Sequence, residues 1–308
     1  MNKTIMITGA NAGIGKETAR QLALKKTTEK IYLACRNEGK AEIAKKDLEE
    51  KTGRSIFEIV IIDVSKPESV KNAVRNLNDP VDALIMNAGG MGGKNPEKLT
   101  PDGVTALTAT NLLGHVVLVD ELIMADKLKN VALFASSEAA RGVKKMGMKQ
   151  PDFGTSSTDE FARVFDGSAF GKDFDAMQVY GMIKYGGTLW MSHMARTNSA
   201  IKFISVSPGG TRGTEVMNDL PFFKRIMFKY IGMPILMPLM GMSHKLSTGA
   251  KRFVDGISNE KFISGKFYAS KTNKLTGALV DQNEIFSNLS NENYQDNASD
   301  AIHRFIRG

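Results

Sequence analysis

The chain begins with a short apolar run that passes directly into a glycine-rich turn and then into a helical pattern. Residues 4–8 read Thr-Ile-Met-Ile-Thr, and glycines follow at positions 9, 13 and 15. A strand, a turn and a helix in this order leave free backbone N–H groups at the helix start, where glycines allow a pyrophosphate to approach. The spacing is neither Gly-x-Gly-x-x-Gly nor a Walker loop. We expect a dinucleotide site here, against the alternative of an ordinary glycine-rich turn.

Further apolar segments alternate with amphipathic ones along the chain. Strand patterns recur at residues 30–35, 56–62, 81–86, 131–135, 201–207 and 266–269. Helical patterns lie near residues 15–25, 37–51, 67–77, 102–127, 179–197 and 245–256. Such alternation indicates parallel strands that helices cover on both faces. The predicted fold class is therefore α/β, a doubly wound parallel (Rossmann) sheet, in a single domain over residues 1–308.

Small or polar residues follow five of the predicted strands. They are Cys35-Arg36-Asn37, Asp63-Val64, Asn87-Ala88-Gly89, Ser136-Ser137 and Ser207-Pro208-Gly209. Each group alone is ordinary loop chemistry. The carboxyl ends of parallel strands, however, meet at one edge of the sheet, where ligands collect. Five such groups in register predict one site at that edge.

Composition excludes several other classes of protein. The net charge is +8, but the lysines are dispersed and lack aromatic neighbours, so we expect no nucleic-acid partner. The single cysteine allows no internal disulfide, and the four histidines have no metal-ligand spacing, so we expect no metal. No early segment has the pattern of a signal peptide, and we expect a cytoplasmic protein.

The motifs together resemble the short-chain dehydrogenase/reductase family. Those that carry the resemblance are Thr8-Gly-Ala-Asn-Ala-Gly13-Ile-Gly15, Asp63-Val64, Asn87-Ala88-Gly89, Asn111, Ser137, Tyr180-Gly-Met-Ile-Lys184 and Pro208-Gly209. They run in family order from Met1 to about Gly210. Within the family, the glycine turn, Ala34-Cys35-Arg36 and Asn111-Leu-Leu-Gly114-His115 are most similar to the retinol dehydrogenase and protochlorophyllide reductase branch.

The resemblance implies a catalytic set of Asn111, Ser137, Tyr180 and Lys184. Tyr180 and Lys184 are four residues apart on a predicted helix and therefore share a face. An ammonium beside a phenol favours the phenolate, which suits proton transfer near neutral pH. Ser137 would bind the substrate oxygen, with Ser136 as a competitor, and Asn111 would support a water relay. The alternative is a packed tyrosine beside a solvated lysine.

The resemblance also implies which residues bind the cofactor. They are Gly9, Asn11, Gly13, Ile14, Gly15, Arg36, Asp63, Val64, Asn87, Ala88, Gly89, Tyr180, Lys184, Pro208, Gly209 and Thr211. Arg36 follows the second strand, where an arginine can pair with the 2′-phosphate of NADP and a carboxylate would select NAD. We predict NADP, against the alternatives of NAD and of a plain surface arginine.

Two segments depart from the family pattern. An insertion over residues 142–176 contains five phenylalanines, which predict a packed flap beside the pocket rather than a loose surface loop. A segment over residues 211–244, the family's substrate lid, is rich in methionine with Lys224, Arg225 and Lys229. It predicts a hydrophobic substrate and a peripheral membrane contact, against the alternatives of a dimer contact or plain core.

The sequence therefore predicts an NADP(H)-dependent oxidoreductase acting on the carbonyl or alcohol carbon of a hydrophobic small molecule. Two alternatives stay open: a reductase of a pigment-like or other C=C substrate, and an NADP-binding sensor without turnover. A serine hydrolase is set aside because Gly-x-Ser-x-Gly is absent. The family resemblance also implies a homo-oligomer, associated through the helices around Asn111 and Tyr180.

Overall fold

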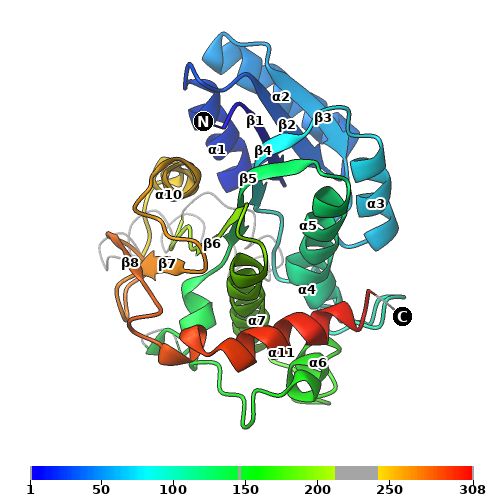
Figure 1. Cartoon of the computed structure of the whole chain (residues 1–308), viewed down its shortest axis with the longest axis vertical. Coiled ribbons are helices and arrows are strands. Elements are labelled where there is room, and N and C mark those ends of the chain that lie inside the picture. Colours follow the sequence, from blue (N-terminus) through cyan, green and yellow to red (C-terminus); the bar gives the residue numbers. More distant parts are fainter. Residues whose placement is uncertain (1, 145–146, 212–241, 307–308) are drawn as a thin grey trace, which may run out of the picture.

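The molecule is built on one eight-stranded sheet. The structure, a computed structural model, describes residues 2–144, 147–211 and 242–306. The strand order is β3-β2-β1-β4-β5-β6-β7-β8, and all neighbours are parallel except β8, which is antiparallel to β7 (Figure 1). The strands are β1 (Thr4–Thr8), β2 (Lys30–Cys35), β3 (Phe57–Ile61), β4 (Val81–Met86), β5 (Leu128–Ala135), β6 (Lys202–Val206), β7 (Phe267–Ser270) and β8 (Leu279–Asp281). This confirms the predicted doubly wound parallel sheet.

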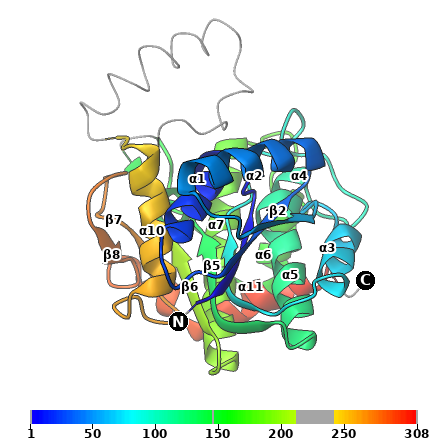
Figure 2. The same cartoon turned by 90° about the horizontal axis from the view of Figure 1, so that it is seen from above.

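Helices cover both faces of the sheet (Figures 1 and 2). One layer holds α1 (Gly13–Ala23), α2 (Glu38–Thr52) and α10 (Leu246–Ser258). The other holds α3 (Pro67–Arg75), α4 (Ala106–Thr108), α5 (Gly114–Met124) and α7 (Ala176–Thr197). Outside α7 lie α6 (Thr158–Phe165) and α11 (Glu292–His303), and short 3-10 helices span Glu138–Arg141 and Ser287–Ser290. The strand order reverses between β1 and β4, so ligands are expected at this switch point.

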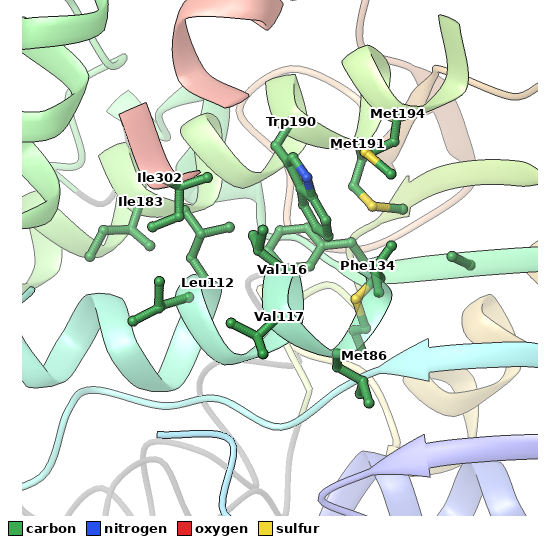
Figure 3. Close-up of a cluster of buried hydrophobic side chains, with 14 of the residues drawn as sticks. Met86, Leu112, Val116, Val117, Phe134, Ile183, Trp190, Met191, Met194 and Ile302 are labelled. Atoms are coloured by element: carbon green, nitrogen blue, oxygen red, sulfur yellow. The ribbon is translucent and has the colours of Figure 1, made fainter. Parts of the chain in front are cut away.

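Both layers are packed because the strands are apolar on both sides. Ile5 and Ile7 enter the layer with α1, whereas Met6 between them enters the layer with α5 and α7. Figure 3 shows part of the second layer, where side chains of β4, β5, α5, α7 and α11 form one buried cluster that includes Trp190. The Trp190 and Phe134 rings meet edge to face, with centroids 6.3 Å apart. This rigid layer positions α7, the helix that carries the predicted catalytic tyrosine.

The predicted helix over residues 102–127 is interrupted. It consists of α4, a π-helical turn over Ala109–Leu113, and α5. The Asn111 amide donates to the Leu107 carbonyl oxygen at 2.9 Å, and π-helical turns of this kind occur often at functional sites. The stretch Ala106–Met124 is also long and apolar enough to cross a membrane, but 72% of it is buried inside the fold.

The insertion over residues 142–176 is packed, as predicted. It contains α6, whose Phe161 is fully buried and lies 4.4 Å from the Phe153 ring, centroid to centroid. Phe161 also approaches Tyr185 of α7, with ring centroids 6.3 Å apart. The phenylalanines therefore anchor this segment to α7, which rules out the loose surface loop for the part that the structure describes.

The predicted substrate lid lies almost entirely outside the described residues, because residues 212–241 are not among them. Its two described ends meet at a parallel bridge between Thr211 and His244. The His244 backbone N–H donates to the Gly210 carbonyl oxygen at 2.7 Å. The segment thus starts and finishes beside the turn that follows β6.

Candidate active site

A cavity of about 240 Å³ opens at the carboxyl ends of β1, β4, β5 and β6. Ten of the predicted site residues line it: Ile14, Asn87, Gly89, Asn111, Ser137, Tyr180, Lys184, Pro208, Gly209 and Thr211. Seven further residues complete the wall: Gly90, Met91, Ala135, Ser136, Met177, Ser207 and Phe253. Three of the five predicted strand-end groups, those after β4, β5 and β6, therefore meet at the switch point, whereas the groups after β2 and β3 do not line the cavity. The described part of the insertion contributes none of them, so its packed flap lies elsewhere than at the cavity wall.

A larger hollow of about 540 Å³ lies beside the outermost strand β3, between β3 and α3. It is lined by Tyr32, Glu58 and the amides of Asn72, Asn76 and Asn78, among others. None of the predicted site residues borders it. We therefore place the candidate site in the smaller cavity, where the titratable and small residues converge.

The glycine turn fits an anionic group. Gly9 and Gly13 have φ of 66° and 54°, a left-handed conformation that glycine adopts without strain. A Cβ on Gly15 would lie 2.4 Å from the Gly9 carbonyl oxygen, so only glycine fits this close approach. The N-cap of α1 is Ala12, and no side chain caps the helix. The first N–H groups of α1 are therefore available to a phosphate, as a dinucleotide requires.

Thr8 connects the glycine turn to the end of β4. Its hydroxyl oxygen accepts the backbone N–H groups of Asn87 and Ala88, both at 2.9 Å, and lies 3.1 Å from Nε2 of His115. Burial lowers the pKa of His115 to about 3, with the nearby Lys184 charge acting in the same direction. The imidazole is therefore neutral. Because the Thr8 oxygen accepts the N–H groups of Asn87 and Ala88, its own hydroxyl proton can be donated to Nε2 of His115. This arrangement fixes the loop that carries Asn87, Ala88 and Gly89 against β1.

Tyr180 and Lys184 point into the cavity from one face of α7. Lys184 is buried, and its Nζ donates to the Ala135 carbonyl oxygen at 2.9 Å and lies 5.6 Å from the Tyr180 ring centroid. Burial lowers the pKa of Lys184 to about 7. Burial raises the pKa of Tyr180 to about 12. A hydrogen bond with Ser137 opposes this shift, and the Glu138 charge adds to it. Burial therefore outweighs any lowering of the Tyr180 pKa by the Lys184 ammonium in this structure.

The structure distinguishes Ser137 from Ser136, and Tyr180 from a second tyrosine of α7, Tyr185. The Ser136 hydroxyl is buried and bonds to Thr188 Oγ1 at 2.8 Å, whereas Ser137 is half-buried and bonds to Tyr180. Tyr185, which follows Lys184 on α7, is fully buried and stacks on Phe286 with ring centroids 5.3 Å apart. The geometry therefore favours Ser137 and Tyr180 over their neighbours.

Asn111 lies in the π-helical turn and holds the loop after β4. Its amide donates to the Gly90 carbonyl oxygen at 2.7 Å, and its carbonyl oxygen accepts the Gly90 N–H at 3.2 Å. With the bond to Leu107, the side chain is fully engaged. A water relay through Asn111 would have to use its backbone carbonyl group rather than its side chain.

Eight predicted cofactor residues lie outside the cavity wall. Gly9, Asn11, Gly13 and Gly15 belong to the glycine turn and the start of α1, Ala88 follows β4, and Arg36, Asp63 and Val64 follow β2 and β3. Arg36 is exposed at the end of β2, and no described residue forms an ion pair or hydrogen bond with its guanidinium group. Lys40 is exposed one turn further on. Asp63 follows β3 and accepts hydrogen bonds from the backbone and hydroxyl of Ser65, at 3.1 and 2.7 Å. Since β2 pairs with β1, Arg36 follows the strand next to the glycine turn, and Asp63 follows the next strand outward. The adenosine half of a dinucleotide would lie on this side of the sheet in this fold.

Sequence reasoning missed a buried charged cluster behind the cavity. Glu138, Arg141 and Arg252 are 3%, 6% and 5% exposed. One signal was present, because Arg252 shares a helix face with the buried residues Gly249 and Gly256, three and four positions away. An arginine on the apolar face of a helix indicates a buried acidic partner, but the sequence does not show that this partner is Glu138.

The chain is similar in sequence to known short-chain dehydrogenases. The family model described as short chain dehydrogenase matches residues 3–148. A short-chain dehydrogenase/reductase of Armillaria gallica is 30% identical over 246 residues, 76% of this chain and 73% of that protein. Dehydrogenase/reductase SDR family member 12 of Bos taurus is 30% identical over 224 residues, which cover 72% of this chain. Retinol dehydrogenase 13 of Mus musculus is 37% identical over 130 residues, 41% of this chain, so the predicted likeness to retinol dehydrogenases is confirmed.

The matched regions cover only part of some relatives. They span 64% of the bovine protein and 37% of the mouse retinol dehydrogenase. Among solved structures, L-sorbose reductase from Gluconobacter frateurii, complexed with NADPH and L-sorbose, superposes with a TM-score of 0.62. It is 18% identical, and the match covers 90% of this chain and 97% of that one. This likeness supports the fold alone.

Proposed function

Because the chain belongs to the short-chain dehydrogenase/reductase family, we propose that it is an NADP(H)-dependent oxidoreductase acting on a hydrophobic small molecule. It would move a hydride between the nicotinamide and the carbonyl or alcohol carbon of its substrate. The observation that carries the proposal is the convergence of Ser137, Tyr180 and Lys184 on one cavity at the switch point of the sheet. A protein that only sensed NADP would need none of the three.

The roles of these residues follow from their chemistry. The nicotinamide, when bound, supplies or accepts the hydride. The Tyr180 hydroxyl would donate a proton to the substrate oxygen during reduction and take it back during oxidation. The Ser137 hydroxyl would hold that oxygen beside the phenol. Lys184 would stabilise the phenolate, because its ammonium faces the Tyr180 ring inside a cavity of low polarity.

The preference for NADP rests on Arg36. The guanidinium group is exposed beside the glycine turn and has no partner in the described part of the chain, so it is available to a 2′-phosphate. Lys16, which is also near this turn, is instead paired with Asp47 at 2.8 Å. Arg36 and Lys40 thus supply positive charge where NADP carries its extra phosphate and NAD carries none.

The substrate class rests on the apolar part of the cavity wall. Ile14, Met91, Met177 and Phe253 line it, and Met177 is 40% exposed. Methionine side chains adapt to irregular apolar ligands, which suits a hydrophobic carbonyl or alcohol compound.

We further propose that the protein is cytoplasmic and contacts membranes through residues 211–244. Flotation with anionic liposomes tests this contact, and protein that stays at the bottom of the gradient contradicts it.

We also propose that the protein forms a homo-oligomer, with one constraint from the fold. The C-terminal helix α11 packs against α7 and α6 (Figure 1). His193 of α7 lies 2.7 Å from an Asp296 carboxylate oxygen, and His303 lies 3.0 Å from Asp120 of α5. A second copy approaching these helices would therefore contact α11. Light scattering after size-exclusion chromatography measures the number of subunits, and a monomer would overturn this part of the proposal.

A substrate panel with matched tyrosine variants tests the enzymatic proposal. NADPH oxidation is followed at its nicotinamide absorbance with apolar aldehydes, ketones and quinones. We expect turnover of at least one compound, loss of turnover in Tyr180→Phe, and little change in Tyr185→Phe, whose buried hydroxyl has no described partner. NADPH binding with no turnover, and with equal behaviour of the two variants, would support the sensor instead.

A further inference from the structure

A buried ion pair lies directly behind the cavity. Arg252 Nη1 is 3.5 Å from a Glu138 carboxylate oxygen, and both side chains are more than nine-tenths buried. Arg141, beside them, donates to the carbonyl oxygens of Ser270 and Lys271 at 2.8 and 3.0 Å. Burial lowers the pKa of both arginines, with Glu138 opposing that shift. Charges this deep are costly unless they are paired and hydrogen-bonded, so the cluster constrains every group it contacts.

The carboxylate of Glu138 binds the turn after β6. The Ser207 hydroxyl donates to one of its oxygens, and the Gly209 N–H donates in turn to the Ser207 hydroxyl at 3.0 Å. The other oxygen accepts the backbone N–H of Ser270 at 3.2 Å. Ser207 and Gly209 both line the cavity. Glu138 therefore connects the ends of β5, β6 and β7 through one side chain.

Glu138 is also linked to Ser137, the serine proposed to hold the substrate oxygen. Glu138 follows Ser137 directly, and the Ser137 hydroxyl accepts the Ala139 N–H at 3.2 Å at the start of the 3-10 helix. Arg252 reinforces the turn by donating to the Ser207 carbonyl oxygen at 3.2 Å. A Cβ on Gly209 would lie only 2.5 Å from Arg252 Nη1, so the guanidinium group packs on the turn backbone. The wall that carries Ser137 and the wall that carries Gly209 thus share one rigid support.

We propose that Glu138 is a positioning residue that sets the turn over residues 207–211 relative to Ser137, and so determines how the nicotinamide half of the cofactor is held. This inference rests on the proposed NADP(H)-dependent function. Glu138 does not line the cavity itself and acts through Ser207. Its influence is confined to one half of the cofactor, because the adenosine side is held by the glycine turn and Arg36, far along the sheet edge from β6 and β7.

Calorimetric binding of two ligands to the full chain tests the proposal. NADP⁺ spans both halves of the site, whereas 2′,5′-ADP occupies only the adenosine half. Glu138→Gln keeps the shape of the side chain but removes the charge that accepts the Ser207 hydroxyl. We expect NADP⁺ to bind at least about tenfold more weakly, comparable with loss of one hydrogen bond to a charged group, and 2′,5′-ADP to bind within about twofold of the unmodified protein.

Matched variants separate positioning from damage to the fold. Asp255→Asn makes the same chemical change on α10, where Asp255 pairs with Lys251 at 2.6 Å near the surface, and both ligands should bind as before. Ser207→Ala removes the hydroxyl link and leaves the ion pair, so it should reproduce the selective loss of NADP⁺ affinity even if Glu138→Gln fails to fold.

The outcomes distinguish this inference from the proposed function. Two results would overturn the positioning role: equally weakened binding of both ligands in Glu138→Gln, or unchanged NADP⁺ binding in both Glu138→Gln and Ser207→Ala. In either case, NADP⁺ binding by the unmodified protein would leave the proposed function standing. If the unmodified protein does not bind NADP⁺, the function and the inference are both wrong.

Discussion

Replacing Lys184 by methionine isolates the electrostatic part of the proposed chemistry. Methionine is similar in length and leaves the apolar packing of the stem while it removes the ammonium group. Lys184 Nζ lies 5.6 Å from the Tyr180 ring centroid. At an effective dielectric constant of about 20, two unit charges at that separation attract by about 3 kcal/mol. An attraction of that size corresponds to about two pKa units of the phenol.

The assay is the pH dependence of hydride transfer, measured by stopped flow in the direction of alcohol oxidation, where the phenolate accepts the proton. We expect the rising limb of the profile to move up by about two pH units in Lys184→Met, and the rate at neutral pH to fall roughly a hundredfold. Lys202→Met is the control, since burial lowers the pKa of Lys202 too, but it lies at the amino end of β6. A limb that stays in place in Lys184→Met would refute the reasoning, provided the variant melts like the unmodified protein.

Three further predictions follow from the cofactor side and the core. Arg36→Asp should shift the cofactor preference from NADPH toward NADH, while Arg75→Asp, an equal charge change on α3, should not. The ratio of kcat/KM for the two cofactors measures this preference. An unchanged ratio in Arg36→Asp would show that Arg36 does not select the cofactor. Bound phosphates should raise the Lys184 pKa from about 7, so the affinity for NADPH, whose nicotinamide ring is uncharged, should be highest below pH 7 and fall as the pH rises above it. Lys184→Met should lose this slope in titration calorimetry. Phe161→Ala should cost about 3–5 kcal/mol of unfolding free energy in urea melts and leave NADP⁺ affinity nearly unchanged; a loss below about 1 kcal/mol would contradict the packed insertion.

The position of the site could be read from the sequence because of a property of parallel sheets. Successive parallel strands bring their carboxyl ends to one edge, so Asn87, Ser137 and Pro208 were predicted together although they lie far apart in the chain. The strands themselves were recognisable because burial on both faces makes them uniformly apolar. The antiparallel strand β8 was missed, since its three residues are too few to form a pattern.

Features that depend on tertiary contacts could not be read in this way. The break in the predicted helix over residues 102–127 arises where the Asn111 side chain bonds to Gly90 and Leu107, and helical periodicity does not reveal that contact. The pairing of Glu138 with Arg252 joins η2, the 3-10 helix over Glu138–Arg141, to α10. A sequence shows that an arginine sits on an apolar helix face, but only the fold shows which carboxylate satisfies it.

The choice between paired serines and tyrosines also needed the structure. Ser136 and Ser137 have the same chemistry, and the family resemblance alone favoured Ser137. Tyr180 was favoured over Tyr185 because a lysine lies four residues beyond Tyr180 and none lies four residues beyond Tyr185. In the fold, the Ser136 hydroxyl is engaged by Thr188 although Ser136 lines the cavity, and Tyr185 is packed on Phe286 away from the cavity wall. Burial separates residues that the sequence leaves equivalent.

Transfer of a labelled hydride tests the central claim most directly. NADPH carrying deuterium at C4 of the nicotinamide is incubated with a carbonyl compound that the protein reduces, and the alcohol is analysed by mass spectrometry. The account predicts deuterium on the former carbonyl carbon with the unmodified protein and with Tyr185→Phe, and almost none with Tyr180→Phe. An unlabelled alcohol, or equal labelling by the two tyrosine variants, would contradict it.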